Sequence, residues 1–306
     1  MMMLKPRSFF LCFCFFCGMQ SATAFEVVLN EKEEICLARK NTTAENCALK
    51  PDLVEIKALL SEMKAEILFQ LQETLIKSIV CTNDSMQIKG KDCADLYMKG
   101  VRQNGVYKID PDGKGSFNVR CDMTTSGGGW TVFQRRLDGS VDFYRGWQDY
   151  KHGFGDLKGE FWLGLDKIHR LTTASRNKLR IDLEDTSGSK RYAEYGLFAV
   201  TSERQKYQLS LGTYSGNAGD SLTRQKDMAF STKDSDNDIY SGKCAIAYKG
   251  GWWYQVCHNS NLNGLYHHGA HSSFADGINW RAWKGYYYSL KSTAMKIRPR
   301  AFGLRA

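Results

Sequence analysis

Residues 127–133 read Gly127-Gly128-Gly129-Trp130-Thr131-Val132-Phe133, a glycine turn signal followed directly by an apolar β-type run. Such a run predicts a strand that begins after a tight turn. The run Leu179-Arg180-Ile181-Asp182-Leu183 also predicts a strand, and residues 166–171 predict a short helix. Further turn signals lie on both sides of these runs: Gly105-Val106-Tyr107, Asp112-Gly113, Asp138-Gly139 and Ser187-Gly188. The chain from Cys93 onward is therefore expected to fold as short strands joined by turns.

Beyond about Tyr207 the pattern changes, because Gly, Ser, Asn and aromatic residues dominate and regular structure is sparse. Loop-rich sequence of this length is usually functional. We therefore expect the binding site in this part of the chain, and we assign Trp130, Trp162 and Trp280 to the core.

Several blocks of residues 93–300 resemble, in order, the fibrinogen C-terminal-like domain. The blocks are Cys93-Ala94-Asp95-Leu96-Tyr97, Asn104-Gly105-Val106-Tyr107, Cys121-Asp122-Met123, Gly128-Gly129-Trp130-Thr131-Val132, Phe143-Tyr144-Arg145-Gly146-Trp147, Gly159-Glu160-Phe161-Trp162-Leu163-Gly164-Leu165, Ala218-Gly219-Asp220-Ser221-Leu222 and Met295-Lys296-Ile297-Arg298. The segment 234–280 looks closest to the ficolin and tachylectin branch, although no collagen-like G-X-Y run is present. The resemblance implies an α+β domain over residues 91–303, built around antiparallel sheet with a loop-rich binding region. It also implies the disulfides Cys93–Cys121 and Cys244–Cys257.

Asp234-Ser235-Asp236-Asn237-Asp238 offers alternating carboxylates on an irregular loop. Oxygen ligands of this kind suit Ca²⁺, and the alternative is a solvated acidic loop. An EF-hand is excluded, because Ile239 and Ala245 stand where that motif requires Gly and Glu.

The resemblance implies a Ca²⁺ site in this loop. Its ligands would be the side chains of Asp236 and Asp238 and the backbone carbonyls of Tyr240 and Gly242, with Asp234 acting through water.

The same resemblance implies a pocket for an acetyl group. Its residues are Tyr248, Val256, Cys257, His258, Phe274 and Ala275. Tyr248 and Phe274 would flank the methyl group, the Cys257 and His258 N–H groups would donate to the acetyl oxygen, and Ala275 would complete the floor. The resemblance further implies a cis peptide bond at Val256–Cys257. We expect the pKa of His258 to be about 6.5, so that ligand binding weakens at acidic pH.

His267 and His271 are four residues apart, which raises the possibility of zinc. The flanking Gly and Ser residues predict a loop, and no H-E-x-x-H motif is present. The rim of the pocket is the simpler interpretation. Catalysis has little support: there is no G-x-S-x-G or P-loop motif, and Cys257, next to His258, is expected in a disulfide.

Residues 1–24 combine a basic start, an apolar run from Phe9 to Phe16 and the small residues Ala22-Thr23-Ala24. This pattern predicts a secretory signal peptide, since the run is too short for a membrane-spanning helix. Seven of the ten cysteines follow it, and this odd number suggests an interchain bond in an oxidising compartment. Asn41 and Asn83 begin glycosylation sequons. The net charge of +9 is scattered, so nucleic acid is not an expected partner.

Residues 25–50 are polar and cysteine-bearing, and we assign them no element. Residues 51–82 predict a helix with a coiled-coil seam. The seam residues are Leu53, Ile56, Leu60, Met63, Ile67, Leu71, Leu75 and Ile79. We expect this helix to assemble a homo-oligomer, most plausibly a trimer or a multiple of it. The alternative is an amphipathic helix packed on the globular domain. Cys36, Cys47 and Cys81 flank the helix and are candidates for interchain bonds.

Together with the resemblance, these features predict a secreted, calcium-dependent, lectin-like protein without membrane insertion. The resemblance implies that it recognises acetylated groups, such as N-acetyl sugars, on microbial or other surfaces. The runner-up is an extracellular matrix or receptor ligand that uses the same face of the domain, and a hydrolase is a distant third.

Overall fold

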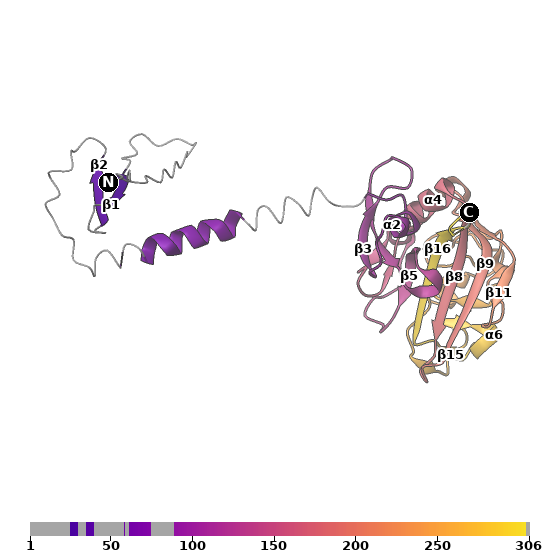
Figure 1. The fold of residues 1–306 in the computed structure, drawn as a ribbon. Helices are drawn as coiled ribbons and strands as arrows, with labels where there is room; N and C mark the ends of the chain where they lie inside the picture. Colours follow the sequence, from indigo (N-terminus) through magenta and orange to yellow (C-terminus); the bar gives the residue numbers. More distant parts are fainter. Residues whose placement is uncertain (1–24, 30–34, 40–57, 59–60, 75–88, 304–306) are drawn as a thin grey trace, which may run out of the picture. The chain divides into compact units, whose positions relative to one another are not determined.

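The computed structural model describes residues 25–29, 35–39, 58, 61–74 and 89–303 (Figure 1). The chain divides into two units, Met1–Met86 and Gln87–Ala306, which we call the N-terminal unit and the globular unit. The predicted signal peptide and the sequons at Asn41 and Asn83 lie outside the described residues. No helix among the described residues is long and apolar enough to cross a bilayer.

The N-terminal unit contains a pair of antiparallel strands that the sequence analysis missed. Strands β1 (Phe25–Leu29) and β2 (Ile35–Arg39) pair antiparallel, with Phe25 opposite Arg39 and Leu29 opposite Ile35. Each strand is only five residues long but rich in apolar or β-branched residues, which favour extended structure. The expectation of no element in residues 25–50 is therefore wrong for 25–29 and 35–39, and the rest of that range lies outside the described residues.

A helix is described over residues 61–74, within the predicted helical segment. Its apolar side chains Met63, Ile67 and Leu71 are 52–61% exposed in the single chain. The helix is confirmed for these residues, and its association with other copies stays a prediction.

The globular unit is built on one large antiparallel sheet (Figure 1). The order of its main strands is β10-β9-β8-β16-β5-β4-β3. The last strand of the chain, β16, lies between β8 and β5, with Met295 opposite both Ile181 and Gln134. The bounds are β3 Gly105–Ile109, β4 Phe117–Asp122, β5 Trp130–Arg136, β8 Asn177–Glu184, β9 Lys190–Val200, β10 Leu209–Leu211 and β16 Ser292–Pro299. The predicted strands at Trp130 and Leu179 are confirmed as β5 and β8.

Shorter elements surround the sheet. The helices are α2 Cys93–Met98, α3 Trp147–His152, α4 Leu165–Ala174, α5 Cys244–Ala247 and α6 Arg281–Lys284. The short strands are β6 Phe154–Gly155, β7 Phe161–Trp162, β11 Tyr214–Gly216, β12 Ser260–Asn261, β13 Gly269–Ala270, β14 Asn279–Trp280 and β15 Tyr288–Ser289. Helix α4 confirms the helix predicted at residues 166–171. The sparse regular structure after Tyr207 is also as predicted, apart from β16.

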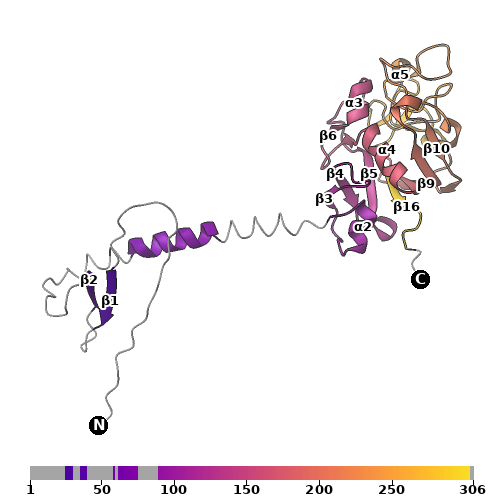
Figure 2. The ribbon, with the colours of Figure 1, turned by 90° about the horizontal axis from the view of Figure 1, so that it is seen from above.

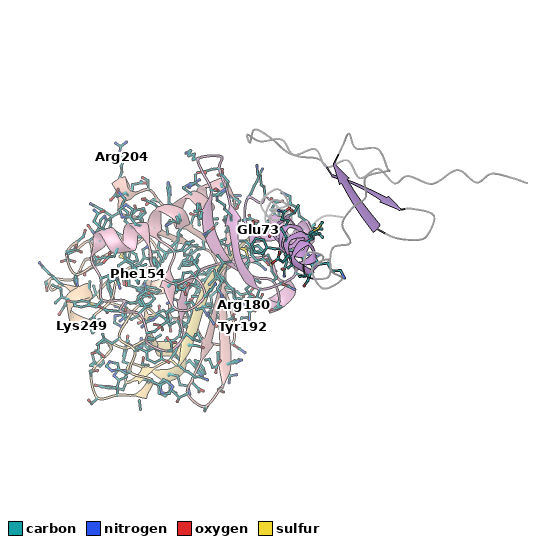
Figure 3. All side chains as sticks on the ribbon, turned by 90° about the vertical axis from the view of Figure 1, so that its left-hand side faces the viewer. Glu73, Phe154, Arg180, Tyr192, Arg204 and Lys249 are labelled. Carbon is teal, nitrogen blue, oxygen red and sulfur yellow. A yellow bond between two sulfur atoms is a disulfide. The ribbon has the colours of Figure 1, made fainter. Side chains whose placement is uncertain are left out.

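The two faces of the sheet differ. On β8, Leu179, Ile181 and Leu183 are buried, whereas the alternating charged side chains of that strand are partly exposed. Figure 2 shows α4 and the region around α5 on one side of the sheet. On the open side the Arg180 guanidinium lies 4.3 Å from the centre of the Tyr192 ring (Figure 3). Trp130, Trp162 and Trp280 are at most 1% exposed, as predicted.

Two buried side chains of β5 attach the sheet to the loop-rich region. Gln134 Nε2 donates to the Leu262 carbonyl at 3.0 Å, and Arg136 Nη1 donates to the Gly264 carbonyl at 2.7 Å. Glu160 is 1% exposed and lies 3.5 Å from Arg136 Nε. Its carboxylate also accepts backbone N–H groups from Leu137, Asp138, Gly139 and Val141. These contacts fix the loops that carry the candidate site.

Both predicted disulfides are present. Cys93, at the start of α2, is bonded to Cys121 on β4. Cys244, at the start of α5, is bonded to Cys257, with their Cα atoms 5.6 Å apart. We call residues 234–238 the acidic loop. The second disulfide links the two ends of the segment 244–257, which follows this loop and leads into the candidate pocket.

Candidate ligand-binding site

Asn261 on β12 forms hydrogen bonds to two tyrosines at the candidate pocket. It is fully buried, and its Nδ2 donates to the Tyr248 carbonyl at 2.9 Å. Its Oδ1 accepts the Tyr254 hydroxyl at 2.8 Å. Strand β12 itself pairs with β14, with Asn261 opposite Asn279. Tyr248, the residue that follows α5, is thereby held against a paired strand.

Aromatic rings from three separate segments meet at the predicted pocket. The rings of Tyr248 and His258 are edge to face, with their centres 4.7 Å apart. The centres of the Tyr248 and Phe274 rings are 6.5 Å apart. Phe274 is 51% exposed, so its ring stands at the surface, whereas His258 is 5% exposed. The structure therefore brings these three predicted residues together.

Two backbone donors face no protein acceptor at this point. Among the described residues, none accepts a hydrogen bond from the N–H of Cys257 or of His258. The adjoining backbone is held on its other side, because Arg224 Nη2 donates to the Val256 carbonyl at 3.1 Å and Gln255 N donates to the Cys257 carbonyl at 2.7 Å. Such N–H groups satisfy their hydrogen-bonding capacity with water or a ligand.

Ala275 has a strained backbone in the position predicted for the floor. Its φ is +62°, in the left-handed region that favours glycine, and the residue is 1% exposed. Its N–H donates to the Tyr286 carbonyl at 3.1 Å. Strain of this kind persists only where the surroundings enforce it, and it occurs often at binding sites.

The expected titration of His258 near neutral pH is wrong. Burial lowers the pKa of His258 to about 3, because the charged ring would lose its hydration. Rings of Tyr248, Tyr254 and Tyr286 surround it, with centres 4.7–5.9 Å away. Neither ring nitrogen has a hydrogen-bond partner among the described residues. His258 is therefore a neutral part of the pocket wall at physiological pH.

The expected cis peptide bond is also wrong. No peptide bond in the described part of the chain is cis, so Val256–Cys257 is trans. The trans form is favoured by about 3–4 kcal/mol for a residue that does not precede proline.

Asp238, at the end of the acidic loop, is held by two backbone N–H groups. The two oxygens of its carboxylate accept the backbone N–H groups of Tyr240 at 2.9 Å and Cys244 at 3.1 Å. Burial and the nearby Asp236 carboxylate raise the pKa of Asp238 to about 6. The close approach of two carboxylates is unfavourable without a cation, so Asp236 and Asp238 fit a Ca²⁺ ion.

Asp234 is hydrogen-bonded within the protein through one carboxylate oxygen, and its contact with Ca²⁺ through water stays a prediction. Its Oδ1 accepts the Trp147 N–H at 2.8 Å and the Thr232 hydroxyl at 2.6 Å. This carboxylate therefore ties the acidic loop to the start of α3.

Sequence reasoning missed Tyr286. Its ring lies 5.1 Å from that of Phe274, and its hydroxyl donates to the His258 carbonyl at 2.9 Å. The run Tyr286-Tyr287-Tyr288 was the available signal, since three consecutive tyrosines in a loop-rich segment are unusual.

A depression lies elsewhere, on the solvent-exposed face of the sheet. It has a volume of about 480 Å³ and is lined by Arg180, Glu184 and Lys190 among others. These charges pair locally, with Arg180 bonded to Glu194 at 2.9 Å and Lys190 3.6 Å from Glu184. Because several of its charged side chains already pair with one another, we favour the aromatic cluster of Tyr248, His258 and Phe274 as the ligand site.

The sequence profile of the C-terminal globular domain of fibrinogen β and γ chains matches residues 89–300. Fibrinogen C domain-containing protein 1 of Xenopus tropicalis is 53% identical over 226 residues, which cover 72% of this chain and 49% of that protein. Ryncolin-4 of Cerberus rynchops is 53% identical over 219 residues, which cover 71% of this chain and 64% of that protein. The chain thus spans about half the length of the first of these relatives.

Solved structures show the same fold. The fibrinogen-like globe domain of human ANGPTL2 has a TM-score of 0.68 and 46% identity, and covers 69% of this chain and 99% of that one. Lamprey fibrin D-dimer, complexed with the peptide Gly-His-Arg-Pro-amide, has a TM-score of 0.67 and 35% identity, and covers 83% and 91%. The family prediction is confirmed, and the relatives are consistent with a ficolin-type branch.

Proposed function

Because this protein belongs to the family defined by the C-terminal globular domains of fibrinogen β and γ chains, we propose that its globular unit binds acetylated carbohydrates in the pocket between Tyr248 and Phe274. The observation that carries this proposal is the pair of backbone N–H groups, Cys257 and His258, that lack a protein acceptor. Members of this family are typically secreted binding proteins and not enzymes.

The chemistry of an acetyl group matches the pocket. Its methyl group takes the space between the Tyr248 and Phe274 rings, and its carbonyl oxygen accepts from the two free N–H groups. Small ligand sites commonly combine apolar walls with a few aimed donors. A neutral His258 keeps the wall apolar, and Ala275 places no polar side chain in the floor.

Calcium is part of this proposal. Asp236 and Asp238 would hold the ion with the Tyr240 and Gly242 carbonyls. A bound Ca²⁺ supplies positive charge that offsets the two carboxylates. Asp238 also accepts the N–H of Cys244, which is bonded to Cys257. A fixed acidic loop therefore restrains the cysteine whose N–H faces the ligand.

Retention on acetylated resin tests the acetyl site. We expect the full-length protein to be retained in Ca²⁺ and eluted by N-acetylglucosamine, by acetate and by a chelator. Ile239→Ser is the matched control, because Ile239 is 64% exposed and lies outside the pocket residues. Tyr248→Ala should abolish retention while Ile239→Ser preserves it. Equal retention of both variants would refute the pocket.

A second function is favoured by a separate observation. Large apolar side chains surround the acidic loop and pocket with 39–64% exposure: Ile239, Tyr240, Ile246, Val256, Phe274 and Tyr287. Exposed apolar side chains gathered around one site are typical of protein-binding surfaces. The alternative is therefore a matrix or receptor protein as ligand. Binding of such a protein ligand that survives Tyr248→Ala but is lost in Ile239→Ser would favour this second function.

A further inference from the structure

Two histidines and an aspartate converge beside the pocket. His267 and His271 lie on either side of β13, and their rings stack with centres 4.2 Å apart. Asp276 Oδ1 lies 3.0 Å from His267 Nε2 and 3.8 Å from His271 Nδ1. Within the part of the protein that the structure describes, this is the one group of three His, Cys, Asp or Glu residues near enough to share a metal ion.

Two of the ligand–ligand distances are close to the edge length of a zinc coordination sphere, and all three ligand atoms lie within 4.8 Å of one another. Zinc bonds to nitrogen and oxygen are about 2.0–2.2 Å long, so neighbouring tetrahedral ligands are about 3.3–3.5 Å apart. The two separations from Asp276 Oδ1, 3.0 and 3.8 Å, bracket that value. Small side-chain rotations are sufficient to equalise them.

Ser273 marks the point on which the three ligand atoms converge. Its Oγ lies 2.7 Å from Asp276 Oδ1, 3.1 Å from His271 Nδ1 and 3.5 Å from His267 Nε2. A hydroxyl group within hydrogen-bond reach of all three atoms shows that they face a common centre. An ion at this centre requires only that the short Ser273 side chain rotate away.

The backbone around the cluster is well fixed. His271 N donates to the Tyr287 carbonyl at 3.0 Å, and strand β13 pairs with β15, with Gly269 opposite Ser289. A Cβ atom at Gly277 would lie 2.8 Å from His271 Nε2, so glycine allows the ring to rest against the backbone there. This packing leaves Nδ1 as the nitrogen of His271 that faces the centre.

We propose that His267 Nε2, His271 Nδ1 and Asp276 bind one Zn²⁺ ion, separately from the acidic loop. Two imidazoles and one carboxylate suit zinc, whereas Ca²⁺ prefers oxygen ligands alone. The His267 side chain is 27% exposed and that of Asp276 15%, so the site opens to solvent and a water molecule completes the tetrahedron. His271 Nε2 lacks the acceptor that usually supports a zinc-bound histidine, which limits the affinity.

Calorimetric titration of the full-length protein with Zn²⁺, in saturating Ca²⁺, tests this site. His267→Ala and Asp276→Asn should each remove one zinc equivalent or weaken it at least as much as losing an outer-shell partner does, about 10–100-fold. His268→Asn is the matched control, because His268 is exposed, is none of the three proposed ligands and has a positive φ that asparagine tolerates. It should leave zinc binding unchanged.

Unchanged zinc affinity and stoichiometry in both ligand variants would overturn the proposal, as would absence of zinc binding by the parent protein. Co²⁺ absorption of the parent protein gives a readout that does not depend on variants. The site predicts tetrahedral d–d bands without thiolate charge-transfer bands. Bands dominated by thiolate, which would indicate cysteines of the N-terminal unit, would also contradict it.

Discussion

The Tyr248 ring stands edge-on to the His258 ring, with ring centres 4.7 Å apart and planes inclined by 83°. This contact joins the end of α5 to the segment after the Cys244–Cys257 disulfide. Edge-to-face pairs contribute about 0.5–1.5 kcal/mol beyond the area that they bury. Tyr248 therefore both flanks the proposed acetyl group and covers His258, which makes the tyrosine ring, more than its hydroxyl, the critical group.

Tyr248→Phe should consequently retain acetyl binding, whereas Tyr248→Ala should lose at least about tenfold in affinity, since about 1.4 kcal/mol corresponds to tenfold. No hydrogen bond from the Tyr248 hydroxyl is found among the described residues, so its removal leaves no partner unsatisfied. Calorimetry with N-acetylglucosamine measures both affinities. A large loss in Tyr248→Phe would show that the hydroxyl group contacts the ligand.

Calcium should stabilise the globular unit. A ligand that binds only the native state adds about 2.7 kcal/mol at a concentration one hundred times its Kd. Thermal unfolding should therefore occur at a higher temperature in Ca²⁺ than in chelator, and Asp236→Ala combined with Asp238→Ala should abolish the difference. Identical unfolding curves of the parent protein in Ca²⁺ and in chelator would rule out the calcium site.

Acid should destabilise the fold through His258. Its folded-state pKa of about 3 lies below the unfolded value of 6.5. The unfolded state therefore takes up a proton first, and stability is lost as pH falls from about 6.5 toward 3. At pH 5 the loss is about 2 kcal/mol. Asp238, whose pKa is raised to about 6, acts in the opposite direction over the same pH range. Urea unfolding of the parent protein and of His258→Phe at pH 7 and pH 5 therefore isolates the His258 contribution.

His258→Phe should reduce this pH dependence, since phenylalanine keeps a ring among the three tyrosines but does not titrate. An unchanged slope between pH 7 and pH 5 in the variant would assign the acid sensitivity to other groups.

The buried pair of Arg136 and Glu160 should contribute strongly to stability. Removing one partner of a buried ion pair costs about 3–5 kcal/mol, because the other charge stays buried without compensation. We expect a loss of this size for Glu160→Gln in urea unfolding. Asp149→Asn is the control: Asp149 lies 3.8 Å from Arg145, its side chain is 52% exposed, and its loss should cost less than about 1 kcal/mol. If both substitutions lowered the free energy of unfolding by the same amount, the burial of the Arg136–Glu160 pair would not increase its contribution to stability.

Avidity should depend on the helical segment. A single acetyl group is a very small ligand, so one site should bind near the millimolar end of the affinity scale. Linked sites gain a factor of about 10²–10⁴ in avidity when their spacing matches that of the ligands on the surface. Sedimentation should show the full-length protein as an oligomer, and residues 91–306 alone should bind soluble ligand but release acetylated beads. A monomeric full-length protein would contradict this prediction.

Local patterns were sufficient for much of the fold. The strand at Trp130 follows a glycine turn, and the strand at Leu179 alternates apolar and charged residues, so neighbouring residues contain the information. The insertion of β16 between β5 and β8 depends on pairing between residues more than 100 positions apart, which no local pattern encodes. The same holds for the hydrogen bond from Arg136 to Gly264.

The candidate site likewise divides into features that the local sequence predicts and features that depend on long-range contacts. Family motifs predicted both disulfides, which are confirmed, and they singled out Tyr248, His258 and Phe274, which the structure brings together. The pKa of His258 was not predictable from Cys257-His258-Asn259, a polar-looking segment. Its burial depends on Tyr254 and Tyr286, which the fold brings from either side. His267 and His271 likewise gained a metal-binding geometry only when Asp276 was placed beside them.

Titration of the ¹⁵N-labelled full-length protein with N-acetylglucosamine in Ca²⁺, followed through the amide resonances of Cys257 and His258, tests the central claim most directly. We predict large, saturable shifts of both amides with one common affinity, and their loss in Tyr248→Ala. Saturable binding that leaves both resonances unmoved, or the absence of any binding at ligand concentrations well above the millimolar range, would contradict the proposed acetyl site.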